Sequence, residues 1–206
     1  MVNFLTIGIL LGLSAGLAPG PLLTLVISET LRHDIKSGVK VAIAPIITDL
    51  PIIALTFLVL AKLSNFHKIL GLISLAGGFF ILFMGYENIR STGVEIYLSQ
   101  EKKPNSLTKG IVVNALSPHP YLFWIFVGTP IMTRAMDLNI VAPLAFVAGF
   151  YTLLVGSKVI LAILVGKSKS FLTGHIYIYT IRFLGLVLCI LAFILFYDGL
   201  KLLEIV

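Results

Sequence analysis

Charged residues are scarce in this sequence of 206 residues. Asp, Glu, Lys and Arg make up 12% of it, whereas 58% is hydrophobic and the mean hydropathy is +1.07. Soluble globular domains carry about 25% charged residues, so this balance excludes one. Long polar segments are missing too, because the longest, residues 91–110, is too short to build a core of its own. The sequence therefore predicts an integral membrane protein and excludes catalysis in an appended soluble domain.

Cysteine and common enzyme signatures are also lacking. The single cysteine, Cys189, lies inside an apolar run, which excludes an intrachain disulfide and a cysteine metal site. There is no His-Glu-x-x-His and no phosphate-binding Gly-x-x-x-x-Gly-Lys, and the four histidines are scattered. We therefore expect no enzymatic activity, no cofactor and no metal site, and transport driven by ATP would need a partner chain.

Six apolar stretches account for most of the chain. They cover approximately residues 2–28, 39–61, 69–89, 111–133, 138–165 and 177–203. Each reaches the roughly 20 residues that a helix needs to cross a bilayer. The stretches are continuously apolar rather than alternating, which favours helices over the strands of a membrane β-barrel. The sequence predicts an all-α membrane protein with six transmembrane helices in one polytopic domain, residues 1–206.

The Lys and Arg residues lie singly or in pairs between these stretches. They form no stripe alternating with aromatic residues, so the net charge of +6 does not indicate nucleic acid as a partner. The connections after the first, third and fifth stretches hold ten of the 15, and the opposite side holds four. Because such residues gather in cytoplasmic connections, we expect residues 91–110 in the cytoplasm and both termini outside the plasma membrane.

The second half of the chain repeats features of the first. Ala-Pro-Gly-Pro at 18–21 corresponds to Ser-Pro-His-Pro at 117–120, and Phe-Ile-Leu-Phe occurs at both 80–83 and 193–196. Three spans in each half place the halves in opposite orientations. The sequence therefore predicts a 3+3 inverted repeat, with halves of about 1–95 and 105–206, as in many secondary transporters.

The first and fourth spans are expected to be broken helices. A proline lacks the backbone N–H and clashes with the preceding turn, so each proline pair should interrupt its helix. A break at membrane depth frees polar backbone groups, which protein, water or a ligand must satisfy. We therefore expect a substrate site at the two half-helix starts, residues 20–23 and 119–122; ordinary proline kinks are the alternative. The residues predicted to form it are Pro19, Gly20, Pro21, Leu22, Asp49, Asn114, Pro118, His119 and Pro120.

Asp49 lies in the middle of the second span, where an ionisable group costs roughly 2.5–3.5 kcal/mol. It shares a helix face with Ala42, Pro45 and Thr56, which predicts a polar interior rather than lipid around it. There it could bind a cationic substrate group or carry a coupling ion, a proton above all. The alternative is a buried carboxyl group bonded to free backbone or to a neighbouring hydroxyl.

Four further polar residues have two interpretations each. Lys158, on one face with Tyr151, either joins the site or extends to the lipid headgroups, and the second is favoured. Asn114 either contacts substrate or satisfies the broken backbone, and the second is again favoured. His119 either titrates near neutral pH or bonds a helix end. Glu87, near the end of the third span, either has a functional role or is an ordinary charge at the membrane interface, and the second is favoured.

Small residues recur along three spans. Glycine occupies every fourth position from Gly8 to Gly20, and similar faces run through the third span (71, 74, 78, 85) and the sixth (185, 189, 192, 199). Such faces allow close helix packing. They predict a compact bundle and leave a homodimer open as an alternative.

Several of these motifs occur together in one known family. They are Pro-Gly-Pro at 19–21, the basic connection through Arg32 to Ser37-Gly38, Thr48-Asp49, and Gly110, Asn114 and Ser117-Pro118. In these residues, and in length and span layout, the sequence resembles the lysine-exporter (LysE) family of amino-acid translocators. It departs from the family pattern at Leu22, where the family has Asn, and at His119, where the family has Lys.

The resemblance implies export of amino acids or related small metabolites from the cytoplasm, driven by a proton or ion gradient. Asp49 would bind the substrate ammonium or carry the proton, and the two halves would rock to alternate access. Two alternatives stay open: an inorganic-ion transporter or channel of the same fold, and a non-transporting membrane assembly factor. Measurable conductance would favour the first, and a stoichiometric partner the second.

Overall fold

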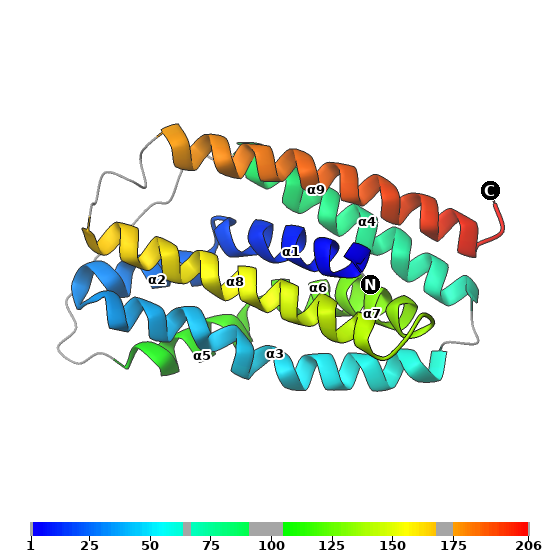
Figure 1. Cartoon of the computed structure of the whole chain (residues 1–206), viewed down its shortest axis with the longest axis horizontal. Coiled ribbons are helices and arrows are strands. Elements are labelled where there is room, and N and C mark those ends of the chain that lie inside the picture. Colours follow the sequence, from blue (N-terminus) through cyan, green and yellow to red (C-terminus); the bar gives the residue numbers. More distant parts are fainter. Residues whose placement is uncertain (1, 64–66, 91–104, 168–174, 206) are drawn as a thin grey trace.

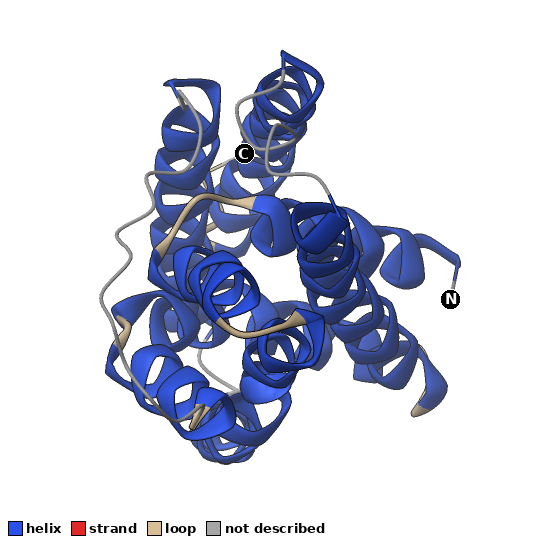
Figure 2. Ribbon diagram, turned by 90° about the vertical axis from the view of Figure 1, so that its left-hand side faces the viewer, coloured by secondary structure: helices blue, strands red, loops and turns tan. Residues whose placement is uncertain are grey.

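The helices of this chain outnumber its predicted spans. The computed structural model describes residues 2–63, 67–90, 105–167 and 175–205. Its elements are α1 (Val2–Leu17), α2 (Pro21–Arg32), α3 (Ile35–Leu63), α4 (His67–Arg90), α5 (Ser106–Leu116), α6 (Pro118–Phe123), η1 (Trp124–Gly128), α7 (Thr129–Met136), α8 (Val141–Lys167) and α9 (His175–Leu202). Every described element is helical (Figure 2), which confirms the predicted all-α class.

The extra helices come from the two predicted breaks. Among the described residues, four helices are long and apolar enough to cross a membrane, and the number of spans rises to six if each bent pair counts as one. The first pair bends by 60° between α1 and α2, and the second by 55° after α5. Pro21 and Pro118 begin the helices that follow, where the missing N–H would have no partner anyway. The prediction that the first and fourth spans are broken is therefore confirmed, whereas the inverted repeat stays a prediction.

Two closely packed helix pairs form the frame of the molecule: α1 lies on α8, and α4 lies on α9 (Figure 1). A Cβ added to Gly12 would collide with the backbone of Phe150 on α8. Gly85 of α4 and Gly185 of α9 face each other, so that a Cβ on either would lie within 2.8 Å of the other's carbonyl oxygen. The small-residue faces thus serve packing within one chain, and each pair joins a helix of the first predicted half to one of the second.

The glycines of α1 also produce a Gly-x-Ser-x-Gly spacing at residues 12–16. In hydrolases this spacing places a nucleophilic serine on a sharp strand-to-helix turn. Here the segment lies inside α1, both glycines face α8, and Ser14 is buried. The spacing therefore reflects helix packing.

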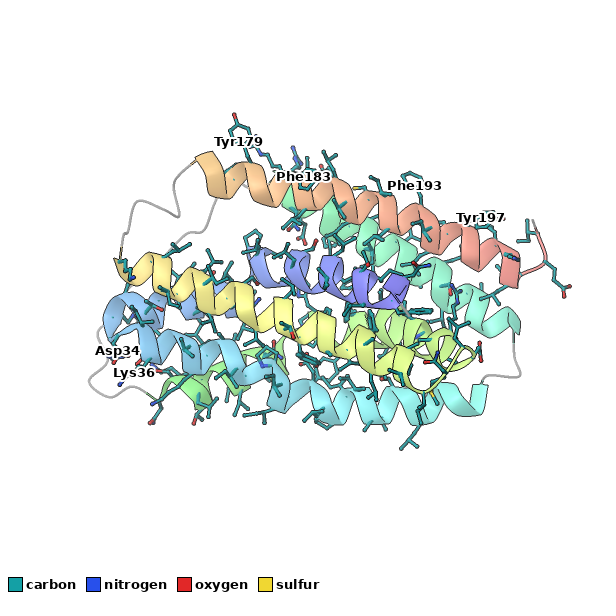
Figure 3. The ribbon with its side chains drawn as sticks, viewed as in Figure 1. Asp34, Lys36, Tyr179, Phe183, Phe193 and Tyr197 are labelled. Atoms are coloured by element: carbon teal, nitrogen blue, oxygen red, sulfur yellow. The ribbon has the colours of Figure 1, made fainter. Side chains whose placement is uncertain are left out.

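The outward face of α9 is apolar. Tyr179, Phe183, Phe193 and Tyr197 project away from the other helices (Figure 3) and are between 58% and 66% exposed. An apolar patch of this kind is rare on a soluble monomer and suits contact with lipid chains.

The aromatic core lies where α6 and η1 meet α8. Phe123 stacks on Phe150 with ring centroids 4.7 Å apart, and Trp124 stacks on Tyr151 at 6.1 Å. Trp124 is fully buried and begins η1, a single turn of π-helix. Such turns shift the register of a helix and often occur at functional sites.

Asp34 lies in the turn between α2 and α3 (Figure 3) and caps the N-terminal end of α3. Its Oδ1 accepts the backbone N–H of Ser37 at 2.7 Å, and this hydrogen bond lowers the pKa of the exposed carboxyl group. The folded pKa thus lies below the unfolded value of about 3.9. The stability that the charged cap contributes is present above that value and is lost as the pH falls through the folded pKa.

We expect the Asp34→Asn variant to keep the cap, because its amide oxygen can still accept the N–H, but to lose this pH dependence. The fall in Tm between pH 7 and pH 3 should be smaller in Asp34→Asn than in the wild type. Asp34→Ala is the control that loses the cap at both pH values. An equal fall in Tm in Asp34→Asn and wild type would contradict the prediction.

Candidate functional site

A cavity lies where the two helix breaks meet. It encloses about 860 Å³ of empty space, the open solvent at its mouth included. Both breaks, the middle of α3, the end of α4 and the middle of α8 contribute to its wall.

The structure brings nearly all the predicted site residues to this wall. Those that line the cavity are Pro19, Gly20, Pro21, Leu22, Asp49, Asn114, His119, Pro120 and Lys158. Tyr151 reaches the site through its hydroxyl group, which donates to Asp49. Pro118 is exposed at the start of α6 and does not line the cavity.

Asp49 is the most heavily hydrogen-bonded group of the cavity. Its Oδ1 accepts from Thr48 Oγ1 at 3.1 Å and from Asn114 Nδ2 at 2.9 Å. Its Oδ2 accepts from Tyr151 Oη at 3.2 Å and from Trp124 Nε1 at 3.4 Å. The side chain is 4% exposed, and its donors come from α3, α5, η1 and α8. Four donors suit a carboxylate, which can only accept hydrogen bonds. Asn114 therefore satisfies Asp49 rather than the broken backbone.

Lys158 is buried, and the prediction that it extends to the lipid headgroups is wrong. It lies in the middle of α8, it is 3% exposed, and its Nζ donates to the carbonyl oxygens of Ala15 at 3.1 Å and Gly16 at 2.8 Å. The break after Leu17 leaves these carbonyl groups without helical partners, and a cation is favourable at the C-terminal end of a helix. The break in α1 therefore holds Lys158 inside the bundle.

The site combines a carboxylate, an ammonium group and a helix start on one cavity, and within the described residues no ion pair joins Asp49 to Lys158. The family model of LysE type translocators matches residues 13–199. The chain belongs to the LysE type translocator family. A search of curated proteins and a search of solved structures found no match. This LysE chain is therefore a multi-pass membrane protein that translocates a small-molecule substrate.

Sequence reasoning missed several residues of the cavity in this LysE chain, among them Trp124, Met84 and Asn88. Trp124 was not foreseen because a π-helical turn, which the sequence did not indicate, directs it to Asp49. Met84, Glu87 and Asn88 line the cavity from the end of α4. Glu87, which the sequence predicts at the membrane interface, is exposed and also lines the cavity. No three His, Cys, Asp or Glu side chains come together as a metal site in the part of the chain that the structure describes.

A second polar cluster in the LysE chain lies outside this cavity and surrounds Glu29, whose side chain is fully buried. It accepts a hydrogen bond from Ser106 Oγ at 2.6 Å and one from Lys109 Nζ at 2.9 Å, and His33 Nε2 lies 3.8 Å away. Ser106 and Lys109 belong to α5, so the cluster ties α2 to α5. Because α2 begins at the first break and α5 ends at the second, the cluster helps to fix the two breaks relative to each other.

We expect Glu29→Gln and Lys109→Met to be coupled in a double-mutant cycle. Each single variant keeps one charge of the ion pair and loses the other, whereas the double variant loses both charges. Lys109 is a quarter exposed, so solvent screening keeps the expected coupling energy at about 1 kcal/mol. Chemical unfolding of the purified protein measures it, and additive effects would contradict the prediction.

Proposed function

We propose that this LysE chain exports zwitterionic α-amino acids, or small metabolites with the same charges, from the cytoplasm across the plasma membrane. The observation that carries the proposal is the pair of opposite charges on one cavity wall. Asp49 and Lys158 both line the cavity without forming an ion pair with each other. A substrate with an ammonium and a carboxylate group can satisfy both.

The carboxylate of such a substrate has two positive partners. Two of the hydrogens of the Lys158 ammonium group are directed to the carbonyl groups of α1, and the third has no partner among the described residues. The N–H groups of Leu22 and Leu23 begin α2, have no partner within the helix, and border the cavity. A half-helix start of this kind favours an anionic substrate group.

The ammonium group of the substrate is assigned to Asp49. This carboxylate is also the proposed carrier of the coupling proton or cation, since a proton on Asp49 would remove the charge that attracts the ammonium. Substrate and proton would therefore be exchanged at the same carboxylate. Substrate would be loaded from the cytoplasm, the side on which residues 91–110 are predicted to lie. The rocking motion that alternates access is predicted from the sequence to occur between the two sequence halves. Because α1 packs closely on α8 and α4 on α9, we assign this motion to these helix pairs instead.

Efflux from proteoliposomes tests the proposal. Vesicles loaded with a mixture of labelled amino acids are followed with and without an imposed pH gradient. Gradient-dependent loss of amino acids supports the proposal. Retention of all of them, together with conductance or ion flux, would replace it with the inorganic-ion alternative.

Binding can be measured separately from transport in the same chain. Trp124 is the only tryptophan and lines the cavity. Its fluorescence in purified protein should therefore change on titration with amino acids. A change in fluorescence without efflux would indicate a binding protein rather than a transporter.

A further inference from the structure

The last turns of α4 form a wall of the cavity that carries neither Asp49 nor Lys158. Met84 and Asn88 are one turn apart on this helix, and Glu87 lies beside Asn88. If the two charged ends of the substrate occupy Asp49, Lys158 and the start of α2, what remains to meet α4 is the side chain of the substrate. The inference below therefore rests on the proposed function.

Asn88 is the unusual residue of this wall. Its side chain is 2% exposed, yet its amide nitrogen has no hydrogen-bond partner among the described residues. Nearly all buried polar side-chain atoms in proteins are hydrogen-bonded, and an unpaired one is unfavourable. Asn114 is the other buried asparagine of the cavity, and its amide nitrogen donates hydrogen bonds to Thr48 and Asp49. Asn88, which lines the cavity, thus has a donor that is not used within the described protein.

The neighbouring groups limit what this donor can bind. Glu87 is a hydrogen-bond acceptor at the same wall, and the remaining side chain, Met84, is apolar. An acceptor oxygen on the substrate side chain satisfies the Asn88 amide, whereas a methyl group in its place leaves the amide unpaired and buried. Sites with such a donor reject analogues that lack the acceptor far more strongly than apolar pockets reject an added group.

We infer that Asn88 is a specificity-determining residue, whose amide nitrogen donates a hydrogen bond to an acceptor oxygen on the side chain of the transported amino acid. It selects oxygen-bearing side chains over apolar side chains of the same shape. Nothing in the sequence pattern identified it, because asparagine near the end of a span is ordinary at a membrane interface.

Isosteric substrate pairs provide the test. Proteoliposomes are loaded with labelled threonine and valine, or with asparagine and leucine, and the efflux ratio within each pair is measured. We expect the wild type to prefer the oxygen-bearing member by at least about tenfold. In Asn88→Leu the ratio should fall to about one, and Asn88→Ser, which keeps a donor, should give an intermediate ratio. Phe83→Leu, a change on the lipid-exposed side of the same helix, is the matched control and should leave the ratio unchanged.

The thermal stability of Asn88→Leu separates binding from a structural role. Because the substitution removes an unpaired buried amide and keeps the number and branching of the side-chain heavy atoms, the Tm should stay equal or rise. A fall in Tm, or failure to fold, means that Asn88 is needed for packing and overturns the inference. An unchanged efflux ratio in a stable Asn88→Leu protein overturns it too, while the proposed function stands. If the wild type exports no amino acid, the proposed function fails as well.

Discussion

Replacing Asp49 with asparagine should reduce gradient-dependent amino-acid efflux by about 10- to 100-fold. Hydrogen bonds to a charged group contribute about 1.5–3 kcal/mol, and 1.4 kcal/mol corresponds to a factor of ten. The amide cannot attract a substrate ammonium group, and it cannot take up a proton. Efflux from proteoliposomes with an imposed pH gradient measures the loss.

The control for this variant is the same chemical change at an exposed carboxylate. Asp137→Asn, at the end of α7, should transport at the wild-type rate. The Asp49 variant must also be folded, because the amide presents its NH₂ group to donors such as Trp124 Nε1 and so loses hydrogen bonds. An Asp49→Asn protein that unfolds at the wild-type temperature and transports normally would end the assignment of Asp49 as ammonium or proton site.

The second large effect is expected at Gly12. In Gly12→Ala the added Cβ would lie 2.9 Å from the carbonyl carbon and the Cα of Phe150, and closer still to the carbonyl oxygen. These are backbone atoms that cannot rotate away, so α1 and α8 must separate along the stretch that holds Lys158. We expect the free energy of unfolding to fall by about 2–3 kcal/mol. Denaturant titration followed by Trp124 fluorescence measures this change.

Gly156→Ala is the matched control for Gly12→Ala. Gly156 lies on α8, and a Cβ added there meets nothing within 4 Å. Since alanine favours a helix over glycine by about 0.5–1 kcal/mol, this variant should be as stable as the wild type or slightly more stable. If the two variants lose the same stability, glycine packing between α1 and α8 is not what holds the pair together.

The sequence was most informative about structural features that a residue causes within its own segment. Pro19 and Pro21, like the second pair, break a helix through their own ring and missing N–H, so the breaks could be predicted without knowing any neighbour. Asp49 could be predicted as a buried site residue because a carboxyl group in mid-span has few stable surroundings. The centre of the candidate site could therefore be predicted from single residues and their spacing.

The sequence was least informative about residues whose surroundings depend on a part of the chain that is far away in the sequence. Lys158 is held by carbonyl groups of α1, which are far away in the sequence and are free because of a break there. Glu29 was missed because the first span was predicted to end at residue 28, which made a buried residue look like part of a connection, whereas α2 continues to Arg32. Asn88 is distinguished by a hydrogen bond that it does not make, a property visible only in three dimensions.

The pairing of α1 with α8 and of α4 with α9 also bears on how the chain is made. Helix α1 is synthesised well before α8, although its glycines pack against the backbone of α8. The glycine face of α1 therefore enters the bilayer before its partner exists, and so does the corresponding face of α4. Assembly of the bundle has to follow insertion, and the cavity with its charged residues forms only after α8 has been inserted.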